Sequence, residues 1–271
     1  MPKKRIALRI DDVFACTKKY EVYGREYIKL GSKGLSISAI SNFLFLKYTP
    51  GFRKRLPYRE LNSKEWESIL EIIERNNIRL TVGITAAWVE KDSSLVPFFE
   101  KFPKEAEALK HGLESGLIEI ANHGYTHCVV GRHLPRLFAS NRNLHREFWS
   151  WVPLETHQRH IMKSQELISQ YFNSAVLTFI PPGNVWTKDT ERFAYEYGLR
   201  YLTSREAICP TGTLSNGLLY LGDASMIAFH DREVVLKGIG WFEDLVKRNL
   251  DKEIVTVQEL SKDFAANVEQ N

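Results

Sequence analysis

Two adjacent aspartates and three histidines stand at or within a few residues of the ends of short apolar runs of the sequence: Asp11, Asp12, His123, His127 and His230. One carboxylate and two imidazoles make a site for a divalent metal ion that keeps positions open for water and substrate. The second carboxylate and the third imidazole are then left to accept and donate a proton. This set of residue types therefore indicates a metal-assisted hydrolase.

These residues meet only if the apolar runs before them are strands that end on one face of a sheet. Strand-like runs alternate with amphipathic helical stretches, which predicts a parallel sheet with crossover helices. We expect strands at Arg5–Ile10, Ile78–Thr85, Leu117–Ala121, Ala175–Ile180, Tyr201–Thr203, Leu218–Leu221, Met226–Phe229 and Ile254–Val257. The expected helices are Lys64–Asn76 with Ser63 as N-cap, a stretch of Leu95–Glu114 broken near Pro103, His157–Phe172, Thr187–Tyr197 and Trp241–Asn249.

About seven or eight such strands predict an α/β fold, namely a distorted single-domain (β/α)7-8 barrel with its active site at the carboxyl ends of the strands. Two long connections interrupt the strand–helix rhythm, at about residues 13–62 and 129–155. Long connections inside a compact domain are usually functional or partly structured. We therefore expect residues 1–271 to form one domain with two insertions.

The composition excludes several classes of protein. The 271 residues include 37 Lys+Arg and 33 Asp+Glu, and a net charge of +4 over this length does not indicate a nucleic-acid partner. No window has the roughly 18 uninterrupted apolar residues of a membrane-spanning helix. The first apolar run contains Arg9 and stops at Asp11, which is typical of a strand and not of an export signal. The widely spaced Cys16, Cys128 and Cys209 indicate reduced thiols, so we expect a cytoplasmic protein.

The order of these motifs resembles the polysaccharide deacetylase family, the NodB-homology domain of carbohydrate esterase family 4. The first motif of that family ends in two aspartates, as Asp11 and Asp12 do here. Its second motif is His-[Ser/Thr]-x-x-His, and His123 and His127 match this spacing with Gly124 in place of Ser or Thr. The resemblance covers nearly the whole chain.

The two later motifs complete the resemblance. The third, which is similar to Arg-x-Pro-x-Gly, is matched by Pro182 and Gly183, but Ile180 stands where Arg is expected. The last motif places a histidine after an apolar strand, as His230 is placed here. In the family, the missing arginine helps to orient the base.

The resemblance implies a distorted barrel with a divalent metal ion, commonly zinc, held by Asp12, His123 and His127. It also implies that Asp11 is the general base and His230 the general acid in removing an N-acyl group, most simply N-acetyl, from a sugar. These roles agree with general chemistry, because a departing amine must be protonated and the attacking water must lose a proton.

The absence of an arginine at position 180 leads to a hypothesis about the second insertion. Its segment 141–148 is rich in polar groups, and we expect Arg146, or failing that Arg142, to replace the missing arginine. The residues expected to bind or support the substrate are Arg146, Pro182, Gly183 and Trp186.

The first insertion combines the basic run Arg53–Arg55 with the apolar run Phe43–Leu46. The basic run suits the phosphates of a sugar carrier and the apolar run suits a membrane surface, although a solvated loop and packing on the barrel are the plainer interpretations. We expect an N-acylated sugar or sugar-carrier substrate, no nucleic acid and no spanning segment, with peripheral membrane contact left open.

Three other functions fit the same residues. The first is removal of another acyl group, such as formyl from a lipid-linked amino sugar, or hydrolysis of a small amide that is not a sugar. The second is Fe(II) oxygenation, because two histidines and one carboxylate also bind that metal, although such sites are common in all-β folds. The third is a non-catalytic sugar-binding or lipid-binding protein, which the absent arginine would explain.

Overall fold

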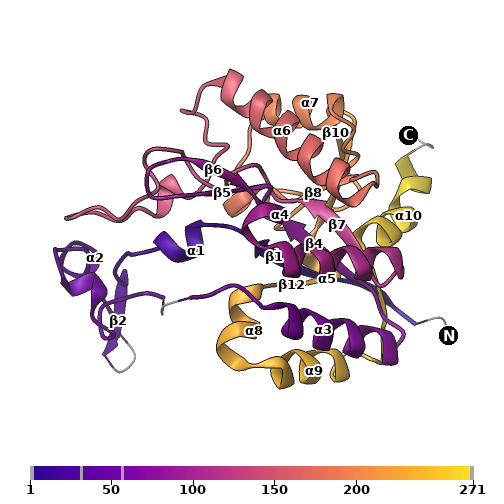
Figure 1. The fold of residues 1–271 in the computed structure, drawn as a ribbon, viewed down its shortest axis with the longest axis horizontal. Helices are drawn as coiled ribbons and strands as arrows, with labels where there is room; N and C mark the ends of the chain where they lie inside the picture. The colour runs from indigo at the N-terminus through magenta and orange to yellow at the C-terminus, as the bar shows by residue number, and fades with distance from the viewer. Residues whose placement is uncertain (1–2, 31–32, 56–57, 269–271) are drawn as a thin grey trace.

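A sheet of nine strands forms the centre of the computed structural model, which describes residues 3–30, 33–55 and 58–268 (Figure 1). Its strands are β1 (Arg5–Val13), β4 (Leu80–Ile84), β7 (Ile118–Asn122), β8 (Thr178–Phe179), β9 (Tyr201–Ser204), β10 (Leu214–Ser215), β11 (Leu218–Gly222), β12 (Met226–His230) and β13 (Glu253–Val255). Their order is β10-β11-β9-β8-β7-β4-β1-β12, and β13 also pairs with β1. Every pairing is parallel except that of β10 with β11. The predicted α/β class is confirmed.

The sheet is strongly curved, so that strands distant in pairing order face each other. Three strands lie between β1 and β9 in that order, yet Arg9 Nη1 donates a hydrogen bond of 2.7 Å to Thr203 Oγ1. Thr203 Oγ1 also lies 3.1 Å from Met226 Sδ, at the start of β12. This curvature gives the predicted distorted barrel, whose described strands form no pairing that joins β10 to β12.

Helices cover both sides of the sheet, with α3, α8 and α9 on one side and α6 and α7 on the other (Figure 1). The longer helices are α3 (Ser63–Arg75), α5 (Pro103–Glu114), α6 (Leu154–Phe172), α7 (Lys188–Glu196), α8 (Asp231–Lys237), α9 (Ile239–Lys247) and α10 (Val257–Val268). All five residues of β4 and of β7 are buried, because helices pack on both faces. Each buried Leu or Ile contributes about 1.5–3 kcal/mol.

Several predicted boundaries differ from the structure. Asn62, not Ser63, caps α3, because only Asn62 has a glutamate three residues later to complete a capping box: its side chain accepts from Glu65 N, and Glu65 Oε2 accepts from Asn62 N. Strand β1 continues through both aspartates to Val13. Helices α8 and α10 were not predicted, because each directly follows a strand without a loop that separates the two patterns.

The first insertion extends beyond the carboxyl end of β1 (Figure 1). It contains α1 (Thr17–Tyr20), the hairpin of β2 (Tyr27–Leu30) and β3 (Lys33–Ser36), α2 (Ser38–Ser41) and the 3₁₀ turn η1 (Leu46–Tyr48). A further hairpin, β5 (Ala87–Val89) with β6 (Leu95–Pro97), leads into α4 (Phe98–Lys101), and the second insertion contains the turn η2 (Arg142–Leu144). None of the helices in the described ranges has the length and apolar character needed to cross a bilayer.

Candidate active site

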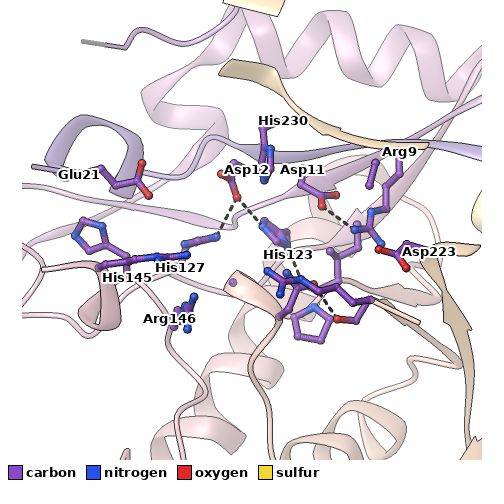
Figure 2. A pocket seen from close by; sticks show the side chains of 18 of the residues that line it. Arg9, Asp11, Asp12, Glu21, His123, His127, His145, Arg146, Asp223 and His230 are labelled. Carbon is purple, nitrogen blue, oxygen red and sulfur yellow. Dashed lines mark hydrogen bonds and ion pairs between the residues drawn. The ribbon is translucent and has the colours of Figure 1, made fainter. Parts of the chain in front are cut away.

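Asp12, His123 and His127 converge at the carboxyl ends of β1 and β7 (Figure 2). Asp12 Oδ1 lies 3.1 Å from His123 Nε2 and 3.1 Å from His127 Nε2. Ligand atoms of one tetrahedral zinc ion, each about 2.0–2.1 Å from the metal, would be separated by about 3.3 Å. The spacing of the three donor atoms therefore fits a single divalent ion.

The hydrogen bonds around the two histidines also favour a cation between these groups. His123 Nδ1 lies 2.7 Å from the carbonyl oxygen of Ile180, which only accepts, so Nδ1 carries the proton and Nε2 presents its lone pair to Asp12. His127 Nε2 is buried and has no hydrogen-bond partner among the described residues. Acceptor atoms this close together repel one another unless a proton or a metal ion lies between them.

The electrostatics of Asp12 are consistent with its place among cations. Burial alone would raise the pKa of Asp12, but the neighbouring His230, His127 and His123 side chains hold it well below the usual value. Asp12 and His127 have positive φ angles of 65° and 57°. Such angles are uncommon outside glycine and cluster at functional sites.

The loop between the two histidines is shaped by Glu147 of the second insertion. Glu147 Oε1 accepts from Tyr125 N at 2.8 Å, and Oε2 accepts from both N and Oγ1 of Thr126, each at 2.8 Å. His160 Nδ1 of α6 lies 2.9 Å from Oε2. Burial would raise the pKa of Glu147, but His160 and the Thr126 donors lower it overall, so this buried carboxylate is ionised.

Glu147 also explains why position 124 is glycine. Gly124 has a φ of +84°, and a Cβ added there would lie 1.9 Å from Glu147 Oε1. A serine or threonine at this position would need the space that the carboxylate occupies. Sequence reasoning did not single out Glu147, although its adjacency to the charged pair His145-Arg146 was the available signal.

Asp11 lies beside the three-residue group and is held by Arg9. Arg9 Nη2 donates to Asp11 Oδ2 at 2.9 Å, while the other oxygen, Oδ1, is buried and finds no partner in the part of the chain that the structure describes. Both side chains are almost completely buried. Arg9 and Asp11 are two residues apart on β1 and therefore face the same side of the strand.

This arrangement corrects the prediction that Arg146 or Arg142 orients Asp11. Arg146 packs over Gly183 and lies 5.5 Å from the ring of Trp149, and Arg142 forms an ion pair of 3.0 Å with Glu26. The prediction was wrong because it sought the arginine in a loop, whereas a strand residue already occupied the position. An arginine inside the otherwise apolar run Ile6–Ile10 was the signal for it.

His230 ends β12 and lies opposite Asp11 in the register of the sheet. Its Nδ1 lies 3.3 Å from Glu233 Oε2, which also accepts from the backbone N of His230. Burial would lower the pKa of His230, but the charges of Asp12, Glu233 and Asp11 and the Glu233 hydrogen bond raise it to about 9. This histidine is therefore protonated near neutral pH, as a general acid must be.

Asp231, the next residue, has a separate role. It is buried and pairs with Lys18 Nζ and with the Tyr58 hydroxyl. Lys18 also lies 2.9 Å from Glu60 Oε1 and donates to the backbone carbonyl of Asp12. This buried cluster, Lys18, Tyr58, Glu60 and Asp231, attaches the first insertion to the ends of β1 and β12.

A cleft of about 330 Å³ lies over these groups, and it is lined mostly by polar side chains. Pro181, Gly183 and Asn184 line it, whereas Pro182 and Trp186 do not. Trp186 Nε1 instead donates to Glu191 at 2.8 Å, which fixes it against α7. Of the four residues predicted to bind or support substrate, Arg146 and Gly183 line the cleft and Pro182 and Trp186 do not, so a supporting role for these two stays a prediction.

Comparison with solved structures supports the fold. A mutant of a Bacillus anthracis pseudoenzyme of the CE4 family, with restored enzymatic activity, has a TM-score of 0.51 at 12% identity, over 96% of this chain and 68% of that one. The Xyl-CE4 domain of a xylanase from the hindgut metagenome of Trinervitermes trinervoides has a TM-score of 0.50 at 14% identity, over 96% and 91%. A 4-α-glucanotransferase from Thermococcus litoralis has a TM-score of 0.53 at 12% identity, over 98% and 41%.

Sequence comparison gives the family. No curated protein matches the chain. The family profile described as polysaccharide deacetylase matches residues 57–202, which contain both histidines of the three-residue group but not Asp11, Asp12 or His230. This range is 146 of the 271 residues, more than half. The chain therefore belongs to the polysaccharide deacetylase family, and its α/β fold is of the NodB type.

Proposed function

We propose that the chain is a metal-dependent hydrolase that removes an N-acyl group, most simply N-acetyl, from a sugar or a polysaccharide precursor. One observation carries this proposal: His123 Nε2 and Asp12 Oδ1, two hydrogen-bond acceptors, lie only 3.1 Å apart. Beside them, His127 Nε2 has no hydrogen-bond partner among the described residues. These atoms suit a divalent ion, zinc first, because imidazole and carboxylate are ligands that zinc prefers.

The residues around this group supply the proton transfers. When bound, the ion would lower the pKa of water and polarise the acyl oxygen. Arg9 holds Oδ2 of Asp11, and Oδ1 has no partner among the described residues. Asp11 accepts a proton from a water molecule as the oxygen of that water attacks the amide carbon. His230, on the neighbouring strand, then donates its proton to the departing amine nitrogen, and the carbon–nitrogen bond breaks.

Acetate release from acetylated sugars tests the proposal. We expect turnover by the metal-loaded protein and a loss of about 10²–10⁴-fold in kcat for Asp11→Asn and for His230→Ala. Asp12→Ala and His123→Ala should lose bound metal, measured by elemental analysis. Equal rates for Asp11→Asn, His230→Ala and the wild type would refute the mechanism.

The same assay separates the alternatives. Release of formate in place of acetate would favour a deformylase, and turnover of a simple amide would favour an amidohydrolase. Activity that needs dioxygen would favour Fe(II) oxygenation. Sugar binding without turnover across the panel would favour a non-catalytic protein.

We also infer, from the cysteine usage of the sequence, that the protein works in the cytoplasm. We infer further that it contacts a membrane there. Phe43, Phe45, Leu137 and Phe138 of the two insertions are 51%, 78%, 69% and 60% exposed, and the rings of Phe43 and Phe138 are 5.5 Å apart. Residues 22–55 contain seven Lys or Arg and one Glu. Exposed aromatic groups beside excess positive charge suit an anionic lipid surface.

Vesicle sedimentation tests this contact. We expect the protein to sediment with vesicles of phosphatidylcholine and phosphatidylglycerol but not with phosphatidylcholine alone. Phe45→Ser and Phe138→Ser should reduce sedimentation, whereas Leu214→Ser, at an exposed position on β10, should not. Sedimentation that is unchanged in both phenylalanine variants would contradict the inference.

A further inference from the structure

Five arginines line the cleft over the proposed metal group: Arg9, Arg55, Arg142, Arg146 and Arg205. Two of them are neutralised by acidic side chains within the cleft. Arg9 pairs with Asp11, and Arg55 pairs with Glu21 at 3.0 Å. The remaining three form a positively charged wall, which we call the arginine wall: Arg142, Arg146 and Arg205.

Arg146 is the centre of the arginine wall. It is half-buried, and no carboxylate in the described ranges pairs with it. Its chain lies where a Cβ at Gly183 would be, with Cγ 2.6 Å and Nε 2.8 Å from that position, and its guanidinium lies 5.5 Å from the Trp149 ring. Gly183 has a φ of +62° and no side chain, so the backbone itself makes room for this arginine.

The arginine wall carries uncompensated positive charge. Burial and the charges of Arg142 and Arg205 lower the pKa of Arg146, while Tyr23 has a small opposite effect. Within the described ranges, the one ion pair of Arg142 is with the outer Glu26, which Lys54 also approaches at 3.7 Å. Arg205 is exposed and has no ion pair among the residues described. Asp223, which also lines the cleft, accepts from Glu206 N.

Three guanidinium groups that line one cleft repel one another unless an anion binds between them. Figure 2 shows Arg146 and His230 on opposite sides of the Asp12, His123 and His127 group. An anion bound by Arg146 would therefore lie away from the proton donor, on a different part of the substrate. Guanidinium groups match the oxygens of phosphate in geometry as well as in charge.

We propose that Arg142, Arg146 and Arg205 form a subsite for a phosphate group, so that the substrate is a phosphorylated or diphosphate-linked acylated sugar and not a neutral polymer. This inference rests on the proposed function for the identity of the sugar part. The inference that the substrate carries an anion rests on the arginine wall alone. It is tested by measuring affinity for phosphorylated sugars, which requires no turnover.

Binding to the metal-loaded Asp11→Asn protein tests the subsite. The probes are N-acetylglucosamine, its 1-phosphate and its uridine diphosphate derivative, measured by calorimetry. We expect the two phosphorylated probes to bind about 10–100-fold more tightly than the neutral sugar, the range of a charged hydrogen bond or two. In the Asp11→Asn protein, Arg146→Gln and Arg205→Gln should each reduce the preference for phosphorylated over neutral sugar about tenfold.

Arg136→Gln is the matched control, because Arg136 is an exposed arginine of the same insertion that does not line the cleft. This substitution should leave the affinities for the neutral and the phosphorylated sugars unchanged. Equal binding of neutral and phosphorylated sugars, or an equal loss for both kinds of probe in Arg146→Gln, would overturn the subsite. If phosphorylated probes bind through Arg146 but no acyl group is ever released, the subsite stands and the proposed function fails.

A second comparison decides whether the phosphate belongs to a lipid carrier or to a nucleotide carrier of the sugar. A polyisoprenyl diphosphate sugar in detergent micelles is compared with the uridine diphosphate sugar for acetate release by the wild-type protein. A higher kcat/KM for either one assigns the carrier and supports the subsite. A higher kcat/KM for a neutral chitin oligosaccharide than for both would refute it, while leaving the hydrolase proposal intact.

Discussion

Replacing Glu147 should weaken both the fold and the metal affinity, because this carboxylate supports the loop between the two histidines. Glu147→Ala would remove the acceptor of Tyr125 N, Thr126 N and His160 Nδ1. The Thr126 hydroxyl retains another acceptor, the carbonyl of Cys128 at 2.8 Å. Three buried donors without acceptors cost about 1–3 kcal/mol each, so we expect a loss of about 3–9 kcal/mol.

That loss is a large part of the 5–15 kcal/mol that usually stabilises a domain, so urea unfolding would detect it readily. Glu147→Gln is the milder variant, because it keeps Oε1 for Tyr125 and places an amide against Thr126 N. In this variant we expect a loss of about 10–100-fold in zinc affinity, measured by competition with a chelator, as is usual for groups that orient metal ligands. Glu166→Ala, which breaks an exposed ion pair with Lys163, should change stability by less than about 0.5 kcal/mol.

A double-mutant cycle makes the same reasoning sharper. Gly124→Ser restores the residue type that the family motif carries, but its Cβ would lie 1.9 Å from Glu147 Oε1. If the clash is the cause of the damage, Gly124→Ser should cost less in the Glu147→Ala background than in the wild type. Equal costs in the two backgrounds, together with wild-type zinc affinity in Glu147→Gln, would refute the role assigned to Glu147.

Three further predictions concern the groups around the cleft. Arg9→Met should lower kcat at least tenfold with little change in KM, because Arg9 acts through Asp11 and not on the substrate. Arg9→Lys should restore part of the lost kcat, and equal kcat values in wild type and Arg9→Met would contradict this role of Arg9. Because Glu233 stabilises the protonated form of His230, kcat should fall as pH rises through the pKa of His230, and Glu233→Gln should move this fall to lower pH; a profile that does not move would exclude Glu233 as a cause. Lys18→Met should cost about 3–5 kcal/mol in urea unfolding, because it leaves buried carboxylates unpaired, and a loss under 1 kcal/mol would disprove that pairing.

The sequence was sufficient to predict the elements with strong periodicity. The alternation of strands and helices predicted the parallel sheet, and α3 was predicted within a residue or two of Ser63–Arg75. The short strand β8 (Thr178–Phe179) was predicted as longer, because apolar residues also continue into loops that are buried. Boundaries of this kind depend on pairing partners that a periodic pattern does not contain.

The placement of the candidate site followed from strand ends, but its supporting groups did not. Asp12, His123 and His127 are far apart in the sequence and meet as expected from parallel strands. Arg9 and Glu147 could not be predicted in the same way, because their roles depend on which side chain fills a given space. That information lies in the curvature of β1 and in the path of the second insertion.

Two departures from the family motifs, Gly124 and Ile180, gave the main reason to consider a protein without activity. The structure gives each departure a counterpart within the chain. Gly124 leaves room for the carboxylate of Glu147, and Arg9 holds Asp11 in place of an arginine at position 180. The absence of an arginine at position 180 is therefore not by itself an argument for a non-catalytic protein, and calorimetry with the phosphorylated sugars tests the substrate class that we propose.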